Sequence, residues 1–328
     1  MGLFFRFLTA FFFFTSIIIA GCNNDSNPVT ETNEPEPEPN TEFEAVGTDS
    51  TLDFATWNLE WFGDRGRGPN DEDLQFENIH FVINGLDMDI WSVQEVNIDS
   101  RFDSLLSTLS GYEGILANDP EVQSDSAYYD DFNGNEQKVG LIYKSDIVTV
   151  ESARVILTEY DHEFAGRPPV EVQLSATIGE QSQNLIVILL HAKCCTDNES
   201  YQRKKTGSEA LKSYLDQTWP AANVMVIGDF NDDVDTSISS GKESVYQNFV
   251  DDPMNYIFPT KELSDSSESS TVFYPDVIDH HLTSDELYEL YVENSVLSFP
   301  ADDYVTNYGE STSDHYPVIS RYILDSGN

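Results

Sequence analysis

Short apolar segments alternate along the chain with amphipathic segments from about Thr51 onward. The apolar segments have the length of strands. Several are apolar at nearly every position, which predicts strands that are buried on both faces beneath helices. The predicted strands are Leu52–Leu59, Ile90–Val96, Val139–Tyr143, Val170–Thr177, Leu185–His191, Val224–Asp229, Val277–Thr283 and Pro317–Leu324. The alternation predicts an α/β fold in one domain, residues 51–328.

Amphipathic segments between these strands are predicted to form helices that cover the sheet. Two helical faces are formed by Phe76, Ile79, Val82, Ile83 and Leu86, and by Phe102, Leu105, Leu106 and Leu109. A third helix is predicted over Glu199–Trp219. The polar, acidic segments Asn118–Gln137 and Lys261–Ser270 are expected to be exposed loops.

The N-terminus has the pattern of an export signal. Arg6 is the only charged residue before position 22, and the apolar run that follows it is too short for a stable membrane-spanning helix. Residues 19–22, Ile-Ala-Gly-Cys, resemble a bacterial lipobox, which implies a lipoprotein signal peptide at 1–21 and lipidation of Cys22. The protein is then exported and anchored to the cell envelope, at the outer membrane or the cell surface, or released from it. The alternative is a plain secreted protein that has Cys22 near its cleavage site.

Residues 22–50 differ in composition from the rest of the chain. They are rich in Asn, Thr, Glu and Pro, and include three Glu-Pro pairs at 34–39. Too few apolar residues are present to form a core, and alternating prolines and like charges keep a chain extended. We therefore expect an acidic, disordered tether between the anchor and the folded domain.

The charge balance is strongly acidic. The sequence has 16 Lys and Arg against 59 Asp and Glu, for a formal net charge of -43. Such a surface is compatible with a salty medium, in which counterions screen the repulsion. It also opposes long-range attraction to nucleic acid, whose phosphates normally meet Lys and Arg. A local groove is still allowed, and the cations predicted to line it are Arg154, Arg167, Lys193, Arg203, Lys204 and Lys205.

Polar residues gather at the ends of the predicted strands, where folding alone does not require them. The groups are Asn58 and Glu60, Gln94 and Glu95, His191, Asp229 and Asn231, Asp279 and His280, and Asp314 and His315. Ligands of α/β proteins bind at the carboxyl ends of strands. Several polar strand ends of this kind predict a single converging site.

These six groups, in this order, resemble the endonuclease/exonuclease/phosphatase family over residues 51–325. The resemblance implies an αββα sandwich of two sheets with the site at one edge. It also implies hydrolysis of phosphate esters with a divalent cation, Mg²⁺ first and Mn²⁺ or Ca²⁺ as alternatives. Members include deoxyribonucleases, abasic-site endonucleases, sphingomyelinases and inositol polyphosphate phosphatases.

Matching positions imply roles for individual residues. Glu95 is the expected metal ligand, with Asn58, Glu60 and Asp314 as direct or water-mediated partners. Hard cations take oxygen ligands of this kind.

Another set is expected to handle the water and the phosphate. Asp229 would orient or deprotonate the attacking water, and Asn231 would hold the phosphate or the nucleophile. His315 would contact the scissile phosphate, oriented by Asp279, and His191 would lie near the leaving oxygen. If both histidines keep their ordinary pKa, the rate depends on pH near about 6.5.

Arg167 resembles an arginine that deoxyribonuclease-like members place on a substrate phosphate, a contact that suits a bidentate guanidinium. The adjacent Cys194 and Cys195 are interpreted as a vicinal disulfide, with free thiols as the alternative.

Other polar and aromatic residues are given structural roles. Trp57, Trp61 and Trp91 are expected in the core, and His80, His162 and His281 are left without a catalytic role. Asp229–Asp235 begins like a calcium loop but fails as an EF-hand, because the sixth position is Val234 and the twelfth is Ser240.

The sequence thus favours an exported nuclease or phosphodiesterase that acts on DNA or RNA. A phosphomonoesterase or a sphingomyelinase-like lipid phosphodiesterase on the same fold is the second candidate. A non-catalytic acidic surface lipoprotein is the third.

Overall fold

The computed structural model describes residues 43–125 and 136–324, all within one compact unit that spans 39–328. The predicted signal peptide, Cys22 and the first part of the predicted tether lie outside the described residues. Within those described ranges, no helix combines the length and the apolar character needed to cross a membrane.

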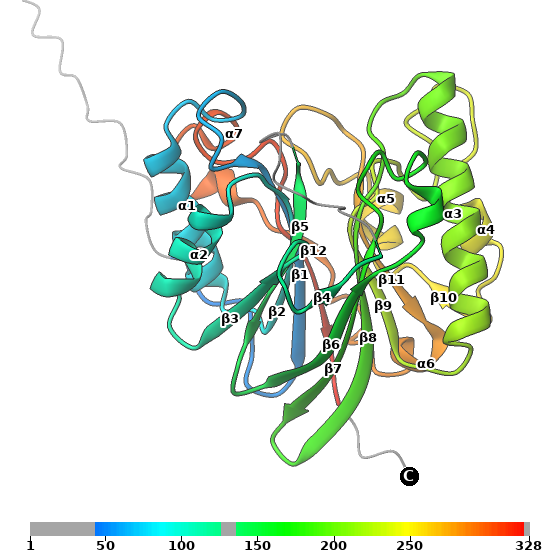
Figure 1. The fold of residues 1–328 in the computed structure, drawn as a ribbon, viewed down its shortest axis with the longest axis horizontal. Helices are drawn as coiled ribbons and strands as arrows, with labels where there is room; N and C mark the ends of the chain where they lie inside the picture. Colours follow the sequence, from blue (N-terminus) through cyan, green and yellow to red (C-terminus); the bar gives the residue numbers. More distant parts are fainter. Residues whose placement is uncertain (1–42, 126–135, 325–328) are drawn as a thin grey trace, which may run out of the picture. The chain divides into compact units, whose positions relative to one another are not determined.

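The strands form two mixed sheets that pack face to face (Figure 1). The first sheet has the order β12 (Leu297–Ser298), β13 (Val318–Tyr322), β1 (Leu52–Phe62), β2 (Ile90–Val96), β5 (Lys138–Lys144) and β3 (Tyr112–Leu116). The second has the order β10 (Tyr256–Ile257), β11 (Asp279–Ser284), β9 (Val224–Asp229), β8 (Gln181–His191), β7 (Val170–Ile178), β6 (Val148–Val155) and β4 (Val122–Gln123).

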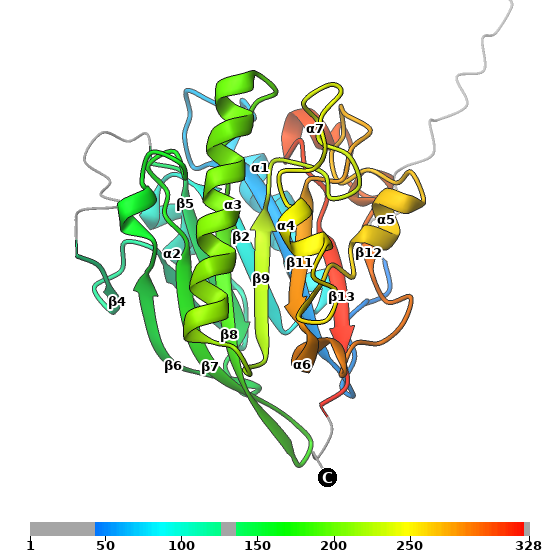
Figure 2. The ribbon, with the colours of Figure 1, turned by 90° about the vertical axis from the view of Figure 1, so that its right-hand side faces the viewer.

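Helices cover the outer face of each sheet. The first sheet carries α1 (Glu72–Leu86) and α2 (Asp99–Thr108), and α3 (Asn198–Thr218) lies along the second, as Figure 2 shows. The shorter elements are η1 (Thr158–Tyr160), α4 (Gln247–Val250), α5 (Lys261–Asp265), α6 (Asp285–Tyr288), η2 (Ala301–Asp303) and α7 (Tyr308–Ser311).

Three apolar layers stabilise this arrangement. Residues such as Phe54 and Leu141 of the first sheet meet Leu174 and Val187 of the second in a shared core. One further layer joins the first sheet to α1 and α2, and another joins the second sheet to α3. Burial on both faces explains why the central strands are apolar at nearly every position. The predicted αββα sandwich is confirmed.

Two strand pairs at the centre of the sandwich are parallel, β1 with β2 and β8 with β9. Their carboxyl ends therefore lie at the same edge of each sheet. Near this edge a polar bridge joins the two sheets. Thr56 Oγ1 donates to Gln94 Oε1 at 3.3 Å, Gln94 Nε2 donates to Ser92 Oγ at 2.9 Å, and Ser92 Oγ donates to the Ile227 carbonyl of the other sheet at 3.2 Å.

Strand β6 is absent from the sequence prediction, and its register explains why. Val148 and Val150 alternate with polar residues, but a bulge between Val150 and Ser152 shifts the pattern, so that Ala153 and Val155 face the core next. A bulge breaks the period of two on which the prediction depends. The predicted exposed loop at 261–270 was also partly wrong, because it contains α5. The loop predicted at 118–137 contains β4, and its residues 126–135 lie outside the described residues.

The predicted tether, residues 22–50, extends too far toward the C-terminus. The Phe43 ring packs 5.1 Å from Phe81 and 4.9 Å from Tyr304 between ring centroids, and the Val46 and Gly47 amides donate to the Leu86 carbonyl at 3.2 and 2.8 Å. Residues 43–47 therefore belong to the folded domain, and the domain boundary at 51 moves toward the N-terminus. A single aromatic residue in a polar segment gave no periodic signal for this contact.

Two adjacent histidines of β11, His280 and His281, are fully buried and belong to the hydrogen-bonded interior. His281 Nδ1 lies 2.6 Å from Ser320 Oγ, and burial, followed by the neighbouring His280, lowers the pKa of His281 to about 3. The folded-state pKa is thus below the ordinary value of 6.5. The neutral His281 ring therefore contributes its full stabilisation of the fold at pH values above 6.5, and this contribution is lost as the pH falls toward the folded-state pKa.

We expect the His281→Gln variant to lose less stability than the wild type as the pH falls. Between about pH 6 and 4, the difference in free energy of unfolding should change by roughly 1.4 kcal/mol per pH unit, because only the wild type must keep this imidazole neutral. Urea unfolding at a series of pH values measures it. The exposed His162→Gln is the control, and parallel curves for wild type and His281→Gln would contradict the prediction.

Candidate active site

Backbone pairing places three of the predicted residues side by side. His191 of β8 is in register with Asp229 of β9, and Asp229 is in register with Asp279 of β11. Asn58 of β1 is in register with Gln94 of β2, so Glu95 follows directly. The site therefore forms where the carboxyl ends of both parallel pairs meet.

The backbone at this edge adopts left-handed conformations that non-glycine residues rarely take. Glu60, Trp61, Glu95 and Asn231 have φ values of 47°, 54°, 58° and 52°. Each costs free energy that the surrounding contacts must supply, and such residues concentrate at functional sites. Here they interrupt the strand alternation at the ends of β1, β2 and β9, where the candidate residues lie.

Asn58 connects the carboxylates of the two sheets. Its Nδ2 donates to Glu95 Oε1 at 3.2 Å and to Asp229 Oδ2 at 3.1 Å, and its Oδ1 accepts the Glu60 amide at 3.0 Å. Ser313 Oγ in turn donates to the Asn58 carbonyl at 2.6 Å. Asn58 was predicted to be a metal partner. Because its amide is engaged at both ends, it acts in this arrangement as a bridge that sets the spacing of Glu95 and Asp229.

His315 and Asp279 form a buried pair. His315 Nδ1 lies 2.8 Å from Asp279 Oδ2, and Ser270 Oγ donates to the same oxygen at 2.7 Å. Burial opposes a charged ring, but the carboxylates of Asp279, Asp229 and Asp314 together raise the pKa of His315 well above its ordinary value. The ring is thus held in orientation and protonated, with Nε2 available to a ligand on the side of Asp314, at 3.8 Å.

His191 has the opposite electrostatic character. It is buried, and its Nε2 lies 3.7 Å from Glu95 Oε1 and 3.6 Å from Asp229 Oδ2. Burial, followed by the positive charges of Arg167 and His315, lowers the pKa of His191 well below its ordinary value. The two histidine pKa values move apart, so the expectation that both lie near the ordinary value is wrong. One cationic and one neutral imidazole flank the same space.

Asp229 is one of two carboxyl groups of the site whose pKa is raised into the neutral range, and Glu60 is the other. Burial is the main cause, and His315 partly offsets it, so the pKa of Asp229 is raised to about 7. The Asn231 amide donates to Asp229 Oδ1 at 2.8 Å. An acid or base with a pKa near the working pH is effective in proton transfer.

Lys204 holds the backbone of Asn231 through a buried hydrogen bond. Lys204 Nζ donates to the Asn231 carbonyl at 2.6 Å and lies 3.6 Å from Asp232 Oδ2, and its side chain is fully buried. Asn231 Nδ2 donates to the Ala192 carbonyl at 3.1 Å. Sequence reasoning had placed Lys204 on a surface groove. A signal existed, because Lys204 occupies an inward position of α3 together with Leu211 and Leu215.

The sequence predicts Glu60, Glu95 and Asp314 as metal partners, and the charge of Asp314 acts on both glutamates. Burial, followed by Asp314, raises the pKa of Glu60 to about 7, and burial likewise raises that of Glu95. Glu60 Oε2 is buried and has no hydrogen-bond partner among the described residues. Neighbouring buried carboxylates repel one another, and a cation removes that cost.

Asp229, Asp279 and His315 offer a second group of ligand atoms within 4.8 Å of one another. His315 Nδ1 and Asp279 Oδ2 are paired there, whereas Asp279 Oδ1 is buried and has no hydrogen-bond partner among the described residues. Both groups of side chains carry oxygen donors of the kind that a hard divalent cation takes.

Arg167 lies at the rim of the second sheet. It donates from Nη2 to the Ala192 carbonyl at 3.1 Å and from Nη1 to Gln137 Oε1. Its charge lowers the pKa of Glu95 and of His191. Arg154, which was predicted to share its groove, instead forms an ion pair with Glu171, 2.9 Å from Nη2 to Oε1. The predicted groove of six cations is therefore wrong in at least Arg154 and Lys204.

Cys194 and Cys195 are free, exposed thiols with their Sγ atoms 2.7 Å apart. The structure therefore does not contain the predicted vicinal disulfide. Lys193 Nζ lies 3.3 Å from Cys194 Sγ, and the hydrogen bonds from Cys195 and Lys193 outweigh burial and lower the pKa of Cys194.

Trp61 was predicted to lie in the core together with Trp57 and Trp91. Trp57 and Trp91 are fully buried, but Trp61 is only half-buried. The left-handed backbone at Glu60 and Trp61 turns the indole out of the sheet's alternation. The Arg67 guanidinium lies over it, 4.5 Å from the ring centroid.

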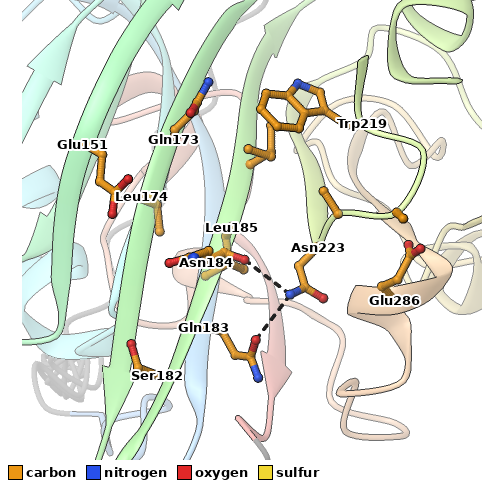
Figure 3. Close-up of a pocket in the computed structure, with 13 residues that line it drawn as sticks. Glu151, Gln173, Leu174, Ser182, Gln183, Asn184, Leu185, Trp219, Asn223 and Glu286 are labelled. Atoms are coloured by element: carbon orange, nitrogen blue, oxygen red, sulfur yellow. Dashed lines mark hydrogen bonds between the residues drawn. The ribbon is translucent and has the colours of Figure 1, made fainter. Parts of the chain in front are cut away.

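A separate pocket of about 740 Å³ lies at the start of β8, at the other end of the strand from His191 (Figure 3). Its lining includes Gln173, Asn184, Asn223 and Glu286, beside Trp219. No lysine, arginine or histidine occurs among the described residues that line it. A pocket with carboxylates and without cations does not suit a phosphate, so the strand-end cluster remains the candidate site.

A model of the endonuclease/exonuclease/phosphatase family matches residues 55–315, from β1 to His315. A comparison with curated protein sequences gave no match.

Several solved structures share the fold. The human Nocturnin catalytic domain with bound sulfate has a TM-score of 0.56 at 17% identity, covering 84% of this chain and 95% of that one. TDP2 of D. rerio, complexed with single strand DNA product, has a TM-score of 0.57 at 13% identity, covering 83% and 99%. A protein of the same family from Bacteroides vulgatus has a TM-score of 0.55 at 13% identity, covering 84% and 99%.

Proposed function

The chain belongs to the endonuclease/exonuclease/phosphatase family, whose members are phosphoesterases and nucleases, and from this membership we propose that it is a divalent-metal-dependent phosphodiesterase that cleaves nucleic acid. The observation that carries the proposal is the convergence of Asp229, His315, His191 and Glu95 at one edge of two sheets. Water attack on a phosphodiester needs a base, a positive contact to the phosphate and an acid or donor near the leaving oxygen. This cluster contains all three.

Each residue has a task that follows from its surroundings. Asp229, with a pKa of about 7, accepts a proton from the attacking water, while the Asn231 side chain holds that water or a phosphate oxygen. Protonated His315 donates from Nε2 to a non-bridging oxygen, and Asp279 and Ser270 fix its ring. His191, neutral and close to Asp229, lies on the leaving-group side.

Glu60, Glu95 and Asp314 would hold the divalent cation. When bound, such a cation stabilises the negative charge that grows on phosphate oxygens. Mg²⁺ needs few protein ligands and keeps several waters, and Mn²⁺ and Ca²⁺ accept the same oxygen donors. Arg167 would contact a phosphate of the substrate beside this centre.

Nucleic acid is the favoured substrate because Arg167 adds a phosphate contact beyond the scissile group. The structural neighbour TDP2 of D. rerio, whose structure is a complex with single strand DNA product, is consistent with it. A phosphomonoesterase or a sphingomyelinase-like enzyme is the second candidate. The large exposed apolar side chains include Met254, Phe273 and Tyr274. We give them no role in lipid binding. The non-catalytic alternative is disfavoured because each of the proposed catalytic side chains is present.

We place the enzyme outside the cytoplasm, anchored to the cell envelope through a lipid on Cys22. The proposal rests on the pattern of residues 1–22, since these residues lie outside the described part of the chain. Metabolic labelling with a radioactive fatty acid, with Cys22→Ser as control, tests the anchor separately from the activity.

The purified domain is expected to hydrolyse bis(4-nitrophenyl) phosphate and oligonucleotides in Mg²⁺ or Mn²⁺, and to lose both activities in EDTA. Added cation should restore them, because the carboxylate cluster is otherwise incomplete for charge stabilisation. The panel should contain DNA, RNA, sphingomyelin, an inositol phosphate and 4-nitrophenyl phosphate. Turnover of only the last two would favour the phosphomonoesterase. A domain that is inactive on every substrate with every cation would refute the proposal.

A further inference from the structure

The segment 63–68, Gly-Asp-Arg-Gly-Arg-Gly, is unusual in so acidic a protein. It places two arginines within three residues in a chain with only 16 Lys and Arg. Both Arg65 and Arg67 are exposed. The proposed chemistry gives this segment no role.

Hydrogen bonds attach this segment to the candidate active site. The Trp61 amide donates to Glu95 Oε2 at 3.1 Å, and Asn97 Nδ2, two residues after Glu95, donates to Asp64 Oδ2 at 3.1 Å. Gly68 packs so closely that an added Cβ would lie 2.6 Å from the Glu60 carbonyl oxygen. These contacts hold the backbone of the segment next to Glu60 and Glu95, while the side chains of Arg65 and Arg67 are exposed.

Trp61 and Arg67 form a stacked pair at the surface. The Arg67 guanidinium carbon is 4.5 Å from the indole centroid, and Arg67 lies 3.8 Å from Asp64 through Nη1. A half-buried indole beneath an exposed guanidinium presents a flat surface with one positive charge. Nucleobases stack on surfaces of this kind, and the guanidinium also contacts phosphates.

The site thus has cations on two sides. Arg167 comes from the loop before β7 in the second sheet, and its charge acts on Glu95. Arg65 and Arg67 come from the loop after β1 in the first sheet, where Trp61 also contacts Glu95. A phosphomonoester needs positive contacts at one phosphate only. Cations that come from loops of both sheets suit a chain of phosphates that crosses the edge of both sheets.

We infer that Trp61, Arg65 and Arg67 form a subsite for a nucleotide adjacent to the scissile phosphate, and that the preferred substrate is single-stranded nucleic acid. This inference rests on the proposed function and specifies its substrate. A base in a duplex is already stacked and paired, so it is not available to Trp61 without an unstacking cost. A single strand offers its bases at no such cost.

The test is binding of a fluorescein-labelled, phosphorothioate oligothymidylate of about eight nucleotides, measured by anisotropy in Mg²⁺. Trp61→Ala should weaken binding by roughly ten- to a hundredfold, the range expected for loss of one stacked base, and Trp61→Phe should restore most of it. The wild type should bind a duplex of the same length more weakly than the single strand. Because Trp61 is half-buried, thermal unfolding of each variant checks that the fold is intact.

The salt dependence counts the phosphate contacts. For single strands the slope of log K against log salt changes by about 0.7 for each contact. Arg67→Ala should reduce the slope by about that amount and Arg65→Ala/Arg67→Ala by about twice that amount. Lys212→Ala is the control, because it removes one positive charge, as Arg67→Ala does. Lys212 lies on α3 and pairs with Asp252, so its loss should leave the slope unchanged.

The outcomes separate this inference from the proposed function. The subsite would be overturned if the Trp61 and arginine variants bound the oligonucleotide with the affinity and salt slope of the wild type, or if the wild type bound the duplex more tightly than the single strand. This holds even if the enzyme hydrolyses bis(4-nitrophenyl) phosphate. A variant-sensitive single-strand affinity in a protein that hydrolyses no phosphodiester would support the subsite and refute the proposed function. In an active enzyme, kcat/KM for the oligonucleotide should fall at least tenfold more than kcat/KM for the small ester.

Discussion

His315→Ala is expected to lower kcat for bis(4-nitrophenyl) phosphate by about a thousandfold, with little change in KM. The variant removes a protonated imidazole that is held by Asp279 at 2.8 Å and aimed at the phosphate. Its contribution exists mainly in the transition state, when charge grows on the non-bridging oxygens, and general acids or oriented donors of this type contribute about 10² to 10⁴ in rate. Steady-state kinetics of the purified variant measures it.

Stability must be controlled in this experiment, because the His315 carbonyl accepts a 2.9 Å bond from Trp57 Nε1. That bond involves the backbone and is retained in the alanine variant. His281→Gln changes another buried histidine outside the site and should keep the wild-type rate. An alanine variant with wild-type kcat would remove His315 from the mechanism. Asp279→Asn should keep part of the activity but shift the acidic or basic limb of the pH profile, since Asp279 positions the ring.

Gly228→Ala is expected to destabilise the fold by at least about 3 kcal/mol. Gly228 has a φ of 153°, and an added Cβ would lie 1.9 Å from the Leu190 carbonyl oxygen of the neighbouring parallel strand. Backbone atoms in a central ladder cannot move aside without separating β8 from β9. The collision therefore lies directly before Asp229 and beside His191.

Urea unfolding of Gly228→Ala should show a lower midpoint than that of Gly179→Ala. Gly179 also has a left-handed φ, of 62°, but its Cβ position is open, so alanine there costs only about 1 to 2 kcal/mol for the backbone conformation. Equal destabilisation of the two variants would contradict the steric argument. If Gly228→Ala does not accumulate as a folded protein, the yields of soluble domain from the two single variants still test the steric argument, because Gly179→Ala should be produced in soluble form.

The sequence predicted an α/β fold with most of the candidate residues at one edge because both follow from local rules, whereas the two-sheet sandwich came from the family resemblance. Strand period and helical period identify β1, β2, β5, β7, β8, β9 and α1 to α3, and polar residues at parallel strand ends must converge. The roles of Asp229, Asp279 and His315 came from the family resemblance and stay a prediction until they are measured.

Other features depend on contacts that no local pattern contains. Ser270 lies in a polar segment and becomes relevant only because the fold places it 2.7 Å from Asp279. Trp61 follows an apolar strand, yet two consecutive left-handed residues turn it outward. The pKa values of His191 and His315 diverge because burial, followed by Arg167 and His315, lowers the first, whereas the carboxylates of Asp279, Asp229 and Asp314 raise the second against the effect of burial. Charge partners distant in sequence decide such shifts.

The bridge from Thr56 through Gln94 and Ser92 to Ile227, together with Asn58 between Glu95 and Asp229, joins the two sheets by side chains at the active edge. The distance between the two halves of the site therefore depends on the thickness of the apolar layer below it, where Met225 and Leu189 pack against the first sheet. Substitutions in that layer alter the width of the catalytic opening without touching a catalytic atom. Evolution can adjust the turnover rate and its temperature dependence through interior methylene groups, while the reacting residues stay unchanged.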